Sequence, residues 1–153
     1  MSINIHATCI LLSRAGEAFD APADSGVLLL GESGAGKSDL ALRLIDQGAR
    51  LVADDQTEIK AEQGQLTASA PASIAGLMEV RHIGLLRLPV LALTSLALYV
   101  DLAPLPEKIE RLPDEQAITL LDYSLRRLRL PGFAASTPAK IRAALLYPQA
   151  ESA

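Results

Sequence analysis

The sequence contains little cysteine, few aromatic residues and no tryptophan. Of its 153 residues, one is cysteine, two are histidine and 3% are aromatic. One cysteine cannot form a disulfide within the chain, and one cysteine with two histidines does not supply the ligands of an ordinary structural zinc site. These shortages exclude a disulfide framework and a structural zinc module, and they favour a reducing compartment such as the cytoplasm.

Positive charge is also scarce. The chain has 14 lysines and arginines against 18 aspartates and glutamates, a net charge of −4. Since a general nucleic-acid-binding protein carries a basic surface, we expect no nucleic-acid partner. The first residues lack the basic region of a secretory signal, and charged residues and prolines interrupt the longest apolar tract, residues 85–105. We therefore expect no membrane partner and a cytoplasmic protein.

What is present fits one compact domain, because half of the residues are apolar and 21% are charged. We expect a single domain over residues 1–148, followed by a tail over residues 149–153. Alternating or continuous apolar runs predict strands, and helical spacing with flanking turn residues predicts helices. The strands are expected at 3–12, 27–30, 50–53, 57–60, 65–70 and 90–100, the helices at 37–47 and 137–147, and a loop at 13–26. This order predicts a mixed α/β fold with a central sheet and few helices.

A glycine-rich run between the strand at 27–30 and the helix at 37–47 matches the phosphate-loop pattern at every fixed position. Its residues are Gly31-Glu32-Ser33-Gly34-Ala35-Gly36-Lys37-Ser38. Glycines let the backbone come close enough for its N–H groups to surround phosphate oxygens. Lys37 would reach the terminal phosphates, and the Ser38 hydroxyl would enter the shell of a magnesium ion. The alternative is a coincidental glycine turn, but the strand before and the helix after it favour nucleotide binding.

Two carboxylates, Asp54 and Asp55, follow the strand at 50–53. Ligands of α/β enzymes bind beyond the carboxyl ends of parallel strands. One aspartate could help to hold magnesium, directly or through water, and the other could accept the proton of an incoming hydroxyl. A solvated pair at a strand end is the alternative. His6, taken alone, is better explained by a structural role on its strand than by a catalytic one.

Two further segments accompany these motifs, His6-Ala7-Thr8-Cys9-Ile10 and Glu79-Val80-Arg81-His82-Ile83-Gly84-Leu85. Together with the phosphate loop and Leu51-Val52-Ala53-Asp54-Asp55, they resemble, in order and approximate spacing, the catalytic domain of the bacterial HPr kinase/phosphorylase family, which phosphorylates a serine of a small phosphocarrier protein. The phosphate loop is common to many enzymes, whereas the paired aspartates and the Glu-x-Arg-x-x-Gly segment are more specific. The likeness is good over residues 1–90.

The resemblance implies a role for each of these residues. Asp55 would accept the proton of the serine, Lys37 would hold the phosphates, and His6 would be the partner of the catalytic acid. Ser38 and Glu79 would be the magnesium ligands, with Asp54 supporting them. Arg81 is suited to holding a phosphate, and a surface ion pair is the alternative.

The resemblance also implies a fold and partners. The fold would be the P-loop kinase core shared with phosphoenolpyruvate carboxykinase, and the cofactors would be ATP and Mg²⁺. The protein partner would be an HPr-type carrier of a sugar or nitrogen phosphotransferase system. Family members form hexamers, so a homo-oligomer is expected.

The sequence departs from the family pattern in several places. His82 stands where the family commonly has glycine, which predicts a local variation without a catalytic role. Residues 126–133 are a partial equivalent of the family's arginine-bearing proline-glycine loop, with Arg129 the nearest match, so we expect kinase activity more than the reverse phosphorylase activity. The basic cluster there could equally be a solvated face or a dock for an acidic edge of the partner. The chain begins almost directly at the catalytic strand, as expected for a short form without the family's amino-terminal domain.

The leading hypothesis is therefore an ATP- and magnesium-dependent serine kinase. A small-molecule kinase would share the phosphate loop and the base but would need an enclosed acceptor pocket. A nucleotide-binding regulator without transfer activity is the third alternative.

Overall fold

The computed structural model describes residues 1–13, 24–104, 108–147 and 149–150. Its elements, in chain order, are β1 (Ser2–Ile5), β2 (Thr8–Ser13), β3 (Asp24–Leu30), α1 (Lys37–Asp46), β4 (Arg50–Ala53), β5 (Thr57–Glu62), β6 (Gln65–Ser69), a 3₁₀ turn (Ala72–Ile74), β7 (Leu77–Val80), β8 (Gly84–Arg87), β9 (Thr94–Ala103), β10 (Gln116–Leu120), β11 (Tyr123–Pro131) and α2 (Thr137–Leu146). Most of the predicted loop at 13–26 lies outside the described residues, and its described ends are strand, because β2 ends at Ser13 and β3 begins at Asp24.

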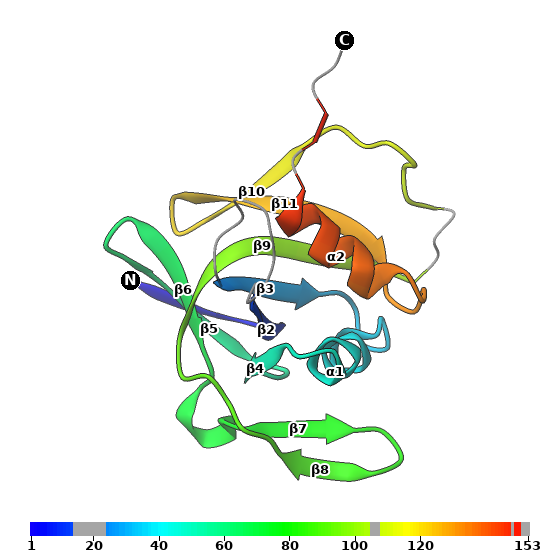
Figure 1. Cartoon of the computed structure of the whole chain (residues 1–153). Coiled ribbons are helices and arrows are strands. Elements are labelled where there is room, and N and C mark those ends of the chain that lie inside the picture. The colour runs from blue at the N-terminus through cyan, green and yellow to red at the C-terminus, as the bar shows by residue number, and fades with distance from the viewer. Residues whose placement is uncertain (14–23, 105–107, 148, 151–153) are drawn as a thin grey trace.

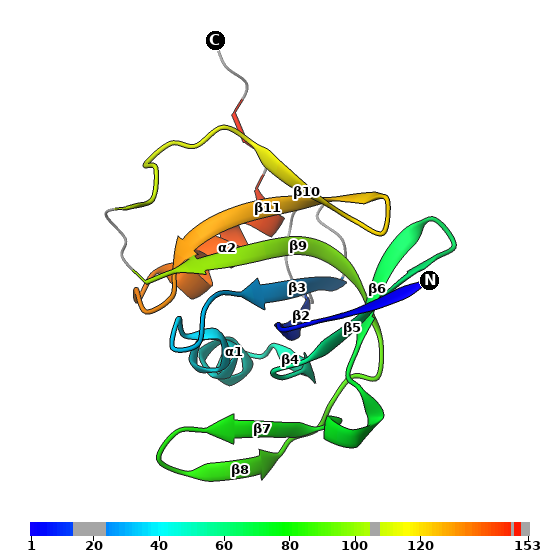
Figure 2. The same cartoon turned by 180° about the vertical axis from the view of Figure 1, so that it is seen from behind.

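One mixed sheet organises the fold. Nine strands form it, in the order β1-β5-β6-β9-β3-β2-β4, with β11 paired to β9 and β10 paired to β11. The long strand β9 runs parallel to β3 and β11 and antiparallel to β6, so it joins the two parts of the sheet. Figures 1 and 2 show the sheet curling along β9, with the hairpin β5–β6 turned away from β3. The expected mixed α/β fold with few helices is confirmed.

Apolar residues cover both faces of the central strands. On one face, Leu40, Ala41 and Leu44 of α1 are fully buried in a core that also contains Ile141 of α2. On the other face, a second core lies between β2, β3 and the hairpin β5–β6, and it includes Ile59. Alternation along β3 sends Val27 and Leu29 to the first core and Leu28 to the second, as expected for a strand buried on both faces.

Several predicted elements need correction. The apolar alternation over residues 3–12 predicted one strand, but the structure breaks it at His6 and Ala7 into β1 and β2. The strand predicted at 90–100 is β9 and lies over Thr94–Ala103. The predicted helix at 137–147 is α2; Ser136 caps it without a side-chain hydrogen bond, and the Thr137 hydroxyl donates to the carbonyl of Pro131. The helix α1, the strand β4 and the hairpin β5–β6 lie where they were predicted.

No helix within residues 1–13, 24–104 and 108–147 is long and apolar enough to cross a membrane. The apolar tract at 85–105 instead supplies residues of β8 and β9.

Candidate active site

The phosphate loop, residues 31–38, connects the carboxyl end of β3 to the first turn of α1. Gly36 has φ 102°, in the left-handed region that glycine enters without strain, and it caps the helix. At Gly31, a Cβ atom would lie 2.9 Å from the Cβ of Ala35, too close for a side chain. The sequence therefore bends tightly at both ends of the loop and directs the backbone N–H groups at the start of α1 toward one place.

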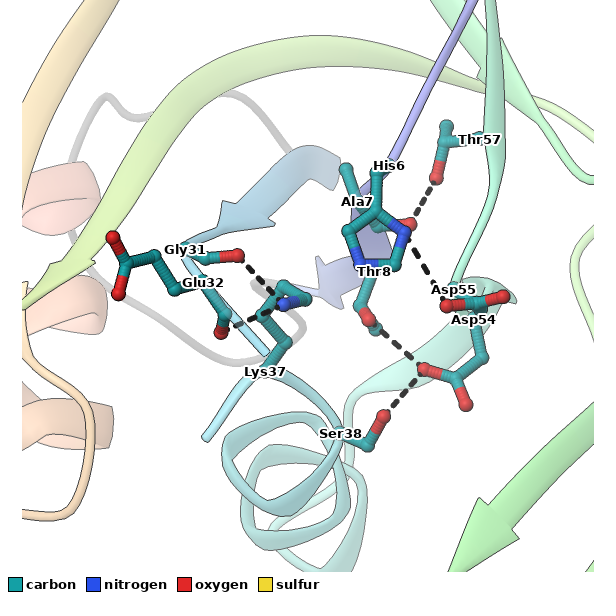
Figure 3. A network of polar contacts seen from close by, with 10 residues as sticks. All are labelled: His6, Ala7, Thr8, Gly31, Glu32, Lys37, Ser38, Asp54, Asp55 and Thr57. Carbon is teal, nitrogen blue, oxygen red and sulfur yellow. Dashed lines mark hydrogen bonds and ion pairs between the residues drawn. The ribbon is translucent and has the colours of Figure 1, made fainter. Parts of the chain in front are cut away.

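Lys37 lies over this loop. Its Nζ donates to the carbonyl of Gly31 at 2.7 Å and to the carbonyl of Glu32 at 3.2 Å, and the side chain is largely buried. These bonds hold the ammonium group at the mouth of the loop (Figure 3). A cation in this position suits the terminal phosphates of a nucleotide.

Asp54 accepts two hydroxyl hydrogen bonds on one carboxylate oxygen. The Ser38 Oγ donates to Oδ1 of Asp54 at 2.8 Å, and the Thr8 Oγ1 donates to the same oxygen at 2.9 Å. Asp54 is buried, with 7% of its surface exposed. A helix-start hydroxyl beside a strand-end carboxylate fits a magnesium ion that completes its shell with phosphate oxygens and water. No group of three or more histidine, cysteine or acidic residues within the described ranges forms an all-protein metal site.

Asp55 lies beside His6. Their Oδ1 and Nδ1 atoms are 3.3 Å apart, and both side chains are more than half exposed. Asp55 has φ 69°, a left-handed conformation that aspartate tolerates better than most residues. The turn around it closes with the Gln56 N–H donating to the carbonyl of Asp54 at 2.8 Å. Asp54 and Asp55 therefore have different surroundings, the first buried and hydrogen-bonded and the second open to solvent (Figure 3).

The topology brings these two loops together. β1 pairs with β5, and β2 pairs with β4. The break at residues 6–7 connects β1 to β2, and the turn at residues 54–56 connects β4 to β5. The two connections therefore run side by side as crossings between the same two strand pairs. The Thr57 hydroxyl ties the crossings by donating to the carbonyl of Ala7 at 2.9 Å. The position of His6 beside Asp55 follows from this double crossing.

An open cleft of about 900 Å³ contains these groups. It brings together His6, Ser33, Gly34, Gly36, Lys37, Ser38, Asp54, Asp55 and Glu79. The remaining predicted loop residues, Gly31, Glu32 and Ala35, form the turn of the phosphate loop without lining the cleft.

The hairpin β7–β8 forms the opposite wall of the cleft, with exposed Glu79, Arg81 and His82. Ile83 and Leu85 add exposed apolar surface there, at 71% and 66% exposure. The sequence analysis did not assign this apolar wall, because an isoleucine and a leucine in an apolar stretch look like core residues.

The basic cluster at 126–129 mostly serves the fold. Arg127 pairs with Asp101 of β9 at 2.6 Å, and Arg126 donates to the carbonyl of Ala144 in α2 at 2.9 Å. Arg129 is exposed on β11 and is not among the described residues that line the cleft. The cluster is therefore neither a wholly solvated face nor a free dock.

Sequence reasoning missed three contributors to the site. The Thr8 hydroxyl and the Phe133 ring are brought to it from β2 and from the loop after β11, and the Arg43 guanidinium of α1 supports it by holding that loop. Thr8 was quoted within a motif without a role, and its only signal was a hydroxyl in an otherwise apolar strand. Arg43 lies on the polar side of the predicted helix at 37–47, where an arginine is ordinary, so nothing local marked it.

Comparisons with known proteins identify the family of this chain. The family model of the HPr Serine kinase C-terminal domain matches residues 22–145. The HPr kinase/phosphorylase of Clostridium acetobutylicum is 37% identical over 116 residues, which cover 69% of this chain and 38% of that protein. The HPr kinase/phosphorylase of Geobacillus sp. (strain WCH70) is 38% identical over 117 residues, with the same coverage of 69% and 38%.

A solved structure gives the same result for the fold. The Hpr(Ser) kinase/phosphatase from Coxiella burnetii superposes with a TM-score of 0.75 at 28% sequence identity, over 92% of this chain and 87% of that one. The expected P-loop kinase fold of the phosphoenolpyruvate carboxykinase type is confirmed. The chain spans 38% of the length of these two curated relatives. With most of its residues matched by the family model, the chain belongs to the HPr serine kinase family, as a counterpart of that family's C-terminal domain.

Proposed function

We propose that this chain is an ATP- and magnesium-dependent serine kinase that phosphorylates an HPr-type phosphocarrier protein. The observation that carries the proposal is the Asp55–His6 pair, which opens into the same cleft as Lys37 and the phosphate loop. A phosphate-binding loop alone needs no base, whereas a kinase needs one within reach of the acceptor hydroxyl.

The nucleotide would be held by the backbone N–H groups of the phosphate loop and by the Lys37 ammonium group. Ser38 and Asp54 would hold magnesium on the side of β4, and Glu79 would approach from the facing wall of the cleft. The ion would neutralise charge on the phosphates. The hydroxyl and carboxylate donors suit Mg²⁺, which takes few protein ligands and prefers oxygen.

Transfer would then run in line. The carboxylate of Asp55 accepts the proton of the acceptor serine as the serine oxygen bonds to the γ-phosphorus. The bond from that phosphorus to the bridging oxygen breaks, and ADP leaves. His6 keeps the Asp55 carboxylate oriented, because its Nδ1 lies 3.3 Å from Oδ1. The exposure of both side chains suits a base that must meet a serine on another protein.

A protein acceptor is favoured over a small molecule by the shape of the cleft. Small-molecule sites enclose most of the ligand, whereas this cleft is open and its wall carries the exposed Ile83 and Leu85. The kinase reaction is favoured over the reverse reaction, because Arg129, the nearest match to the arginine of the family's proline-glycine loop, lies outside the cleft lining. The relatives are named kinase/phosphorylase or kinase/phosphatase, so the reverse reaction is measured in the same assay.

The proposal extends to location and assembly. A cytoplasmic location is supported by the buried free thiol of Cys9, the only cysteine of the chain. A homo-oligomer is proposed from the resemblance to the family alone, whose members form hexamers. Light scattering of the purified protein measures the oligomeric state.

The test is intact-mass and peptide analysis of purified HPr-type carriers incubated with this protein, ATP and magnesium. We expect the mass of one phosphoryl group on one serine. Lys37→Ala should abolish the modification, whereas Lys140→Ala, at an exposed lysine of α2, should not. ATP binding without modification of any carrier would contradict the proposal and favour a small-molecule kinase or a nucleotide-binding regulator.

A further inference from the structure

Phe133 is an exposed aromatic residue beside the phosphate loop. It lies between β11 and α2, with 60% of its surface exposed, and it lines the cleft. The other phenylalanine of the chain, Phe19, falls outside the described residues. A large apolar ring that is exposed in the lining of the cleft is available to contact a bound ligand.

The loop that carries Phe133 is held in place from three sides. The Arg43 guanidinium donates to the carbonyls of Gly132 and Ala134, the latter at 3.1 Å. The Thr137 hydroxyl donates to the carbonyl of Pro131. Gly132 packs so closely on the phosphate loop that a Cβ atom there would lie 1.9 Å from the carbonyl oxygen of Ala35.

The ring itself contacts the phosphate loop. A Cβ atom added to Gly36 would lie 3.1 Å from two ring atoms of Phe133. Gly36 caps α1, where the phosphates of a nucleotide would bind. The ring is therefore placed next to the phosphates, on a loop whose backbone is already held in place, which lowers the ordering cost of a contact.

Strand order shows which end of the nucleotide meets this ring. From β3, which leads into the phosphate loop, β2 and β4 lie on one side, and β4 ends at Asp54 and Asp55. On the other side lie β9 and β11, and β11 ends at the loop of Phe133. In Figure 1 this loop follows the orange strand β11 above the phosphate loop, while β4 lies below it. Since the reacting phosphate must face Asp55, the nucleoside part of the nucleotide would extend from the phosphates toward Phe133.

We propose that Phe133 forms the stacking surface for the nucleobase of the bound nucleotide. The inference rests on the proposed function, because it needs a nucleoside triphosphate in the phosphate loop. Aromatic rings stack on any base through its π-face, so Phe133 supplies affinity without choosing between adenine and guanine. The nucleobase selectivity of the protein then has to come from other groups.

The test compares ligands with and without a base. Calorimetry on the full chain with magnesium measures the affinity for ATP, for GTP and for inorganic tripolyphosphate. Phe133→Ala should lower the affinity for ATP and for GTP by roughly tenfold and leave the affinity for tripolyphosphate unchanged. Phe133→Tyr should keep the wild-type affinity for both nucleotides. Leu112→Ala, which truncates another exposed apolar side chain, should change none of the three.

Each other result has its own meaning. Wild-type affinity of Phe133→Ala for ATP would overturn the stacking proposal, as would an equal loss of ATP and tripolyphosphate, which would indicate a disturbed phosphate loop. A change confined to the KM of the carrier would overturn it in favour of a partner contact. If the wild-type protein bound neither ATP nor tripolyphosphate, the proposed function itself would fail. A thermal unfolding curve for each variant shows that it is folded.

Discussion

The Nδ1 atom of His6 lies 3.3 Å from the Oδ1 atom of Asp55, although the two residues follow different strands. The pair exists because β1–β2 and β4–β5 cross at neighbouring places, tied by the hydrogen bond from Thr57 to Ala7. Asp55 lies in a turn between two strands that are each paired in the sheet, so the backbone pairing on both sides of the turn orients its carboxylate. This suits a catalytic base that is exposed to solvent and must keep one orientation.

His6→Gln should lower the rate of phosphoryl transfer by about tenfold, a smaller loss than removal of the Asp55 carboxylate. If His6 acts by orienting Asp55, then His6→Gln should lower the transfer rate little further in a protein that already carries Asp55→Asn. The losses in rate from groups that act as a unit are not additive. Single-turnover rates of the two single variants and the double variant measure this coupling. Asp122→Asn, in the turn between β10 and β11, is the control and should leave the rate unchanged. Additive losses would show that His6 acts independently of Asp55.

Thr8 and Ser38 donate to the same oxygen of Asp54, yet we expect different losses from their removal. Ser38→Ala should raise the magnesium concentration for half-maximal activity by roughly tenfold, because it removes a proposed ligand. Thr8→Val should lower the free energy of unfolding by about 1–3 kcal/mol, since a buried carboxylate loses a partner. Urea unfolding and magnesium titration of both variants separate the effects. Equal magnesium dependence of Ser38→Ala and the wild type would contradict the metal assignment.

Cys9 should be unreactive in the folded protein. Its side chain is fully buried, and burial raises the pKa of the thiol far above its usual range, so the thiol stays protonated at neutral pH. Above about pH 8.5 only the unfolded chain loses this proton, so the free energy of unfolding should fall as the pH rises further. Iodoacetamide labelling with and without urea checks the first expectation, and Cys9→Ala is the control for the second. Equal labelling rates in both conditions would show that the β2 core is not closed.

His82→Gly should stabilise the hairpin β7–β8. His82 has φ 74°, which costs a side-chain-bearing residue more than glycine, so the free energy of unfolding should rise by about 0.5–1 kcal/mol. Ile83→Gly, at a neighbouring residue outside the positive-φ set, should instead be destabilising. Thermal and urea unfolding measure both changes. A destabilised His82→Gly variant would mean that the imidazole makes contacts worth more than the backbone cost.

Local signals predicted a large part of the fold. The phosphate loop, α1 and the hairpin turned at Gly64 each depend on residues close together in sequence, and each lies where it was expected. The strand at 27–30 was recognised as buried on both faces from its continuous apolar run alone. These elements are set by short-range spacing, which a single sequence displays.

The parts that were missed depend on distant contacts. The apolar alternation continues through His6, so nothing local marks the break between β1 and β2. The hairpin β7–β8 begins after a short turn and buries Met78 while leaving Leu85 exposed, which hydrophobicity alone cannot distinguish. The bonds from Arg43 to the loop of Phe133 join α1 to the end of β11, and only the packed structure brings them together.

The most direct test of the central claim is Asp55→Asn, measured for ATP binding and for serine phosphorylation of the carrier in the same preparation. Asparagine keeps the size of the side chain and also adopts the left-handed backbone, so only the base is removed. Asp122→Asn, another aspartate at positive φ in the turn between β10 and β11, is the matched control. We expect transfer to fall by roughly 10²–10⁴-fold in Asp55→Asn with ATP affinity unchanged. Wild-type transfer rates in a folded Asp55→Asn protein would contradict the account.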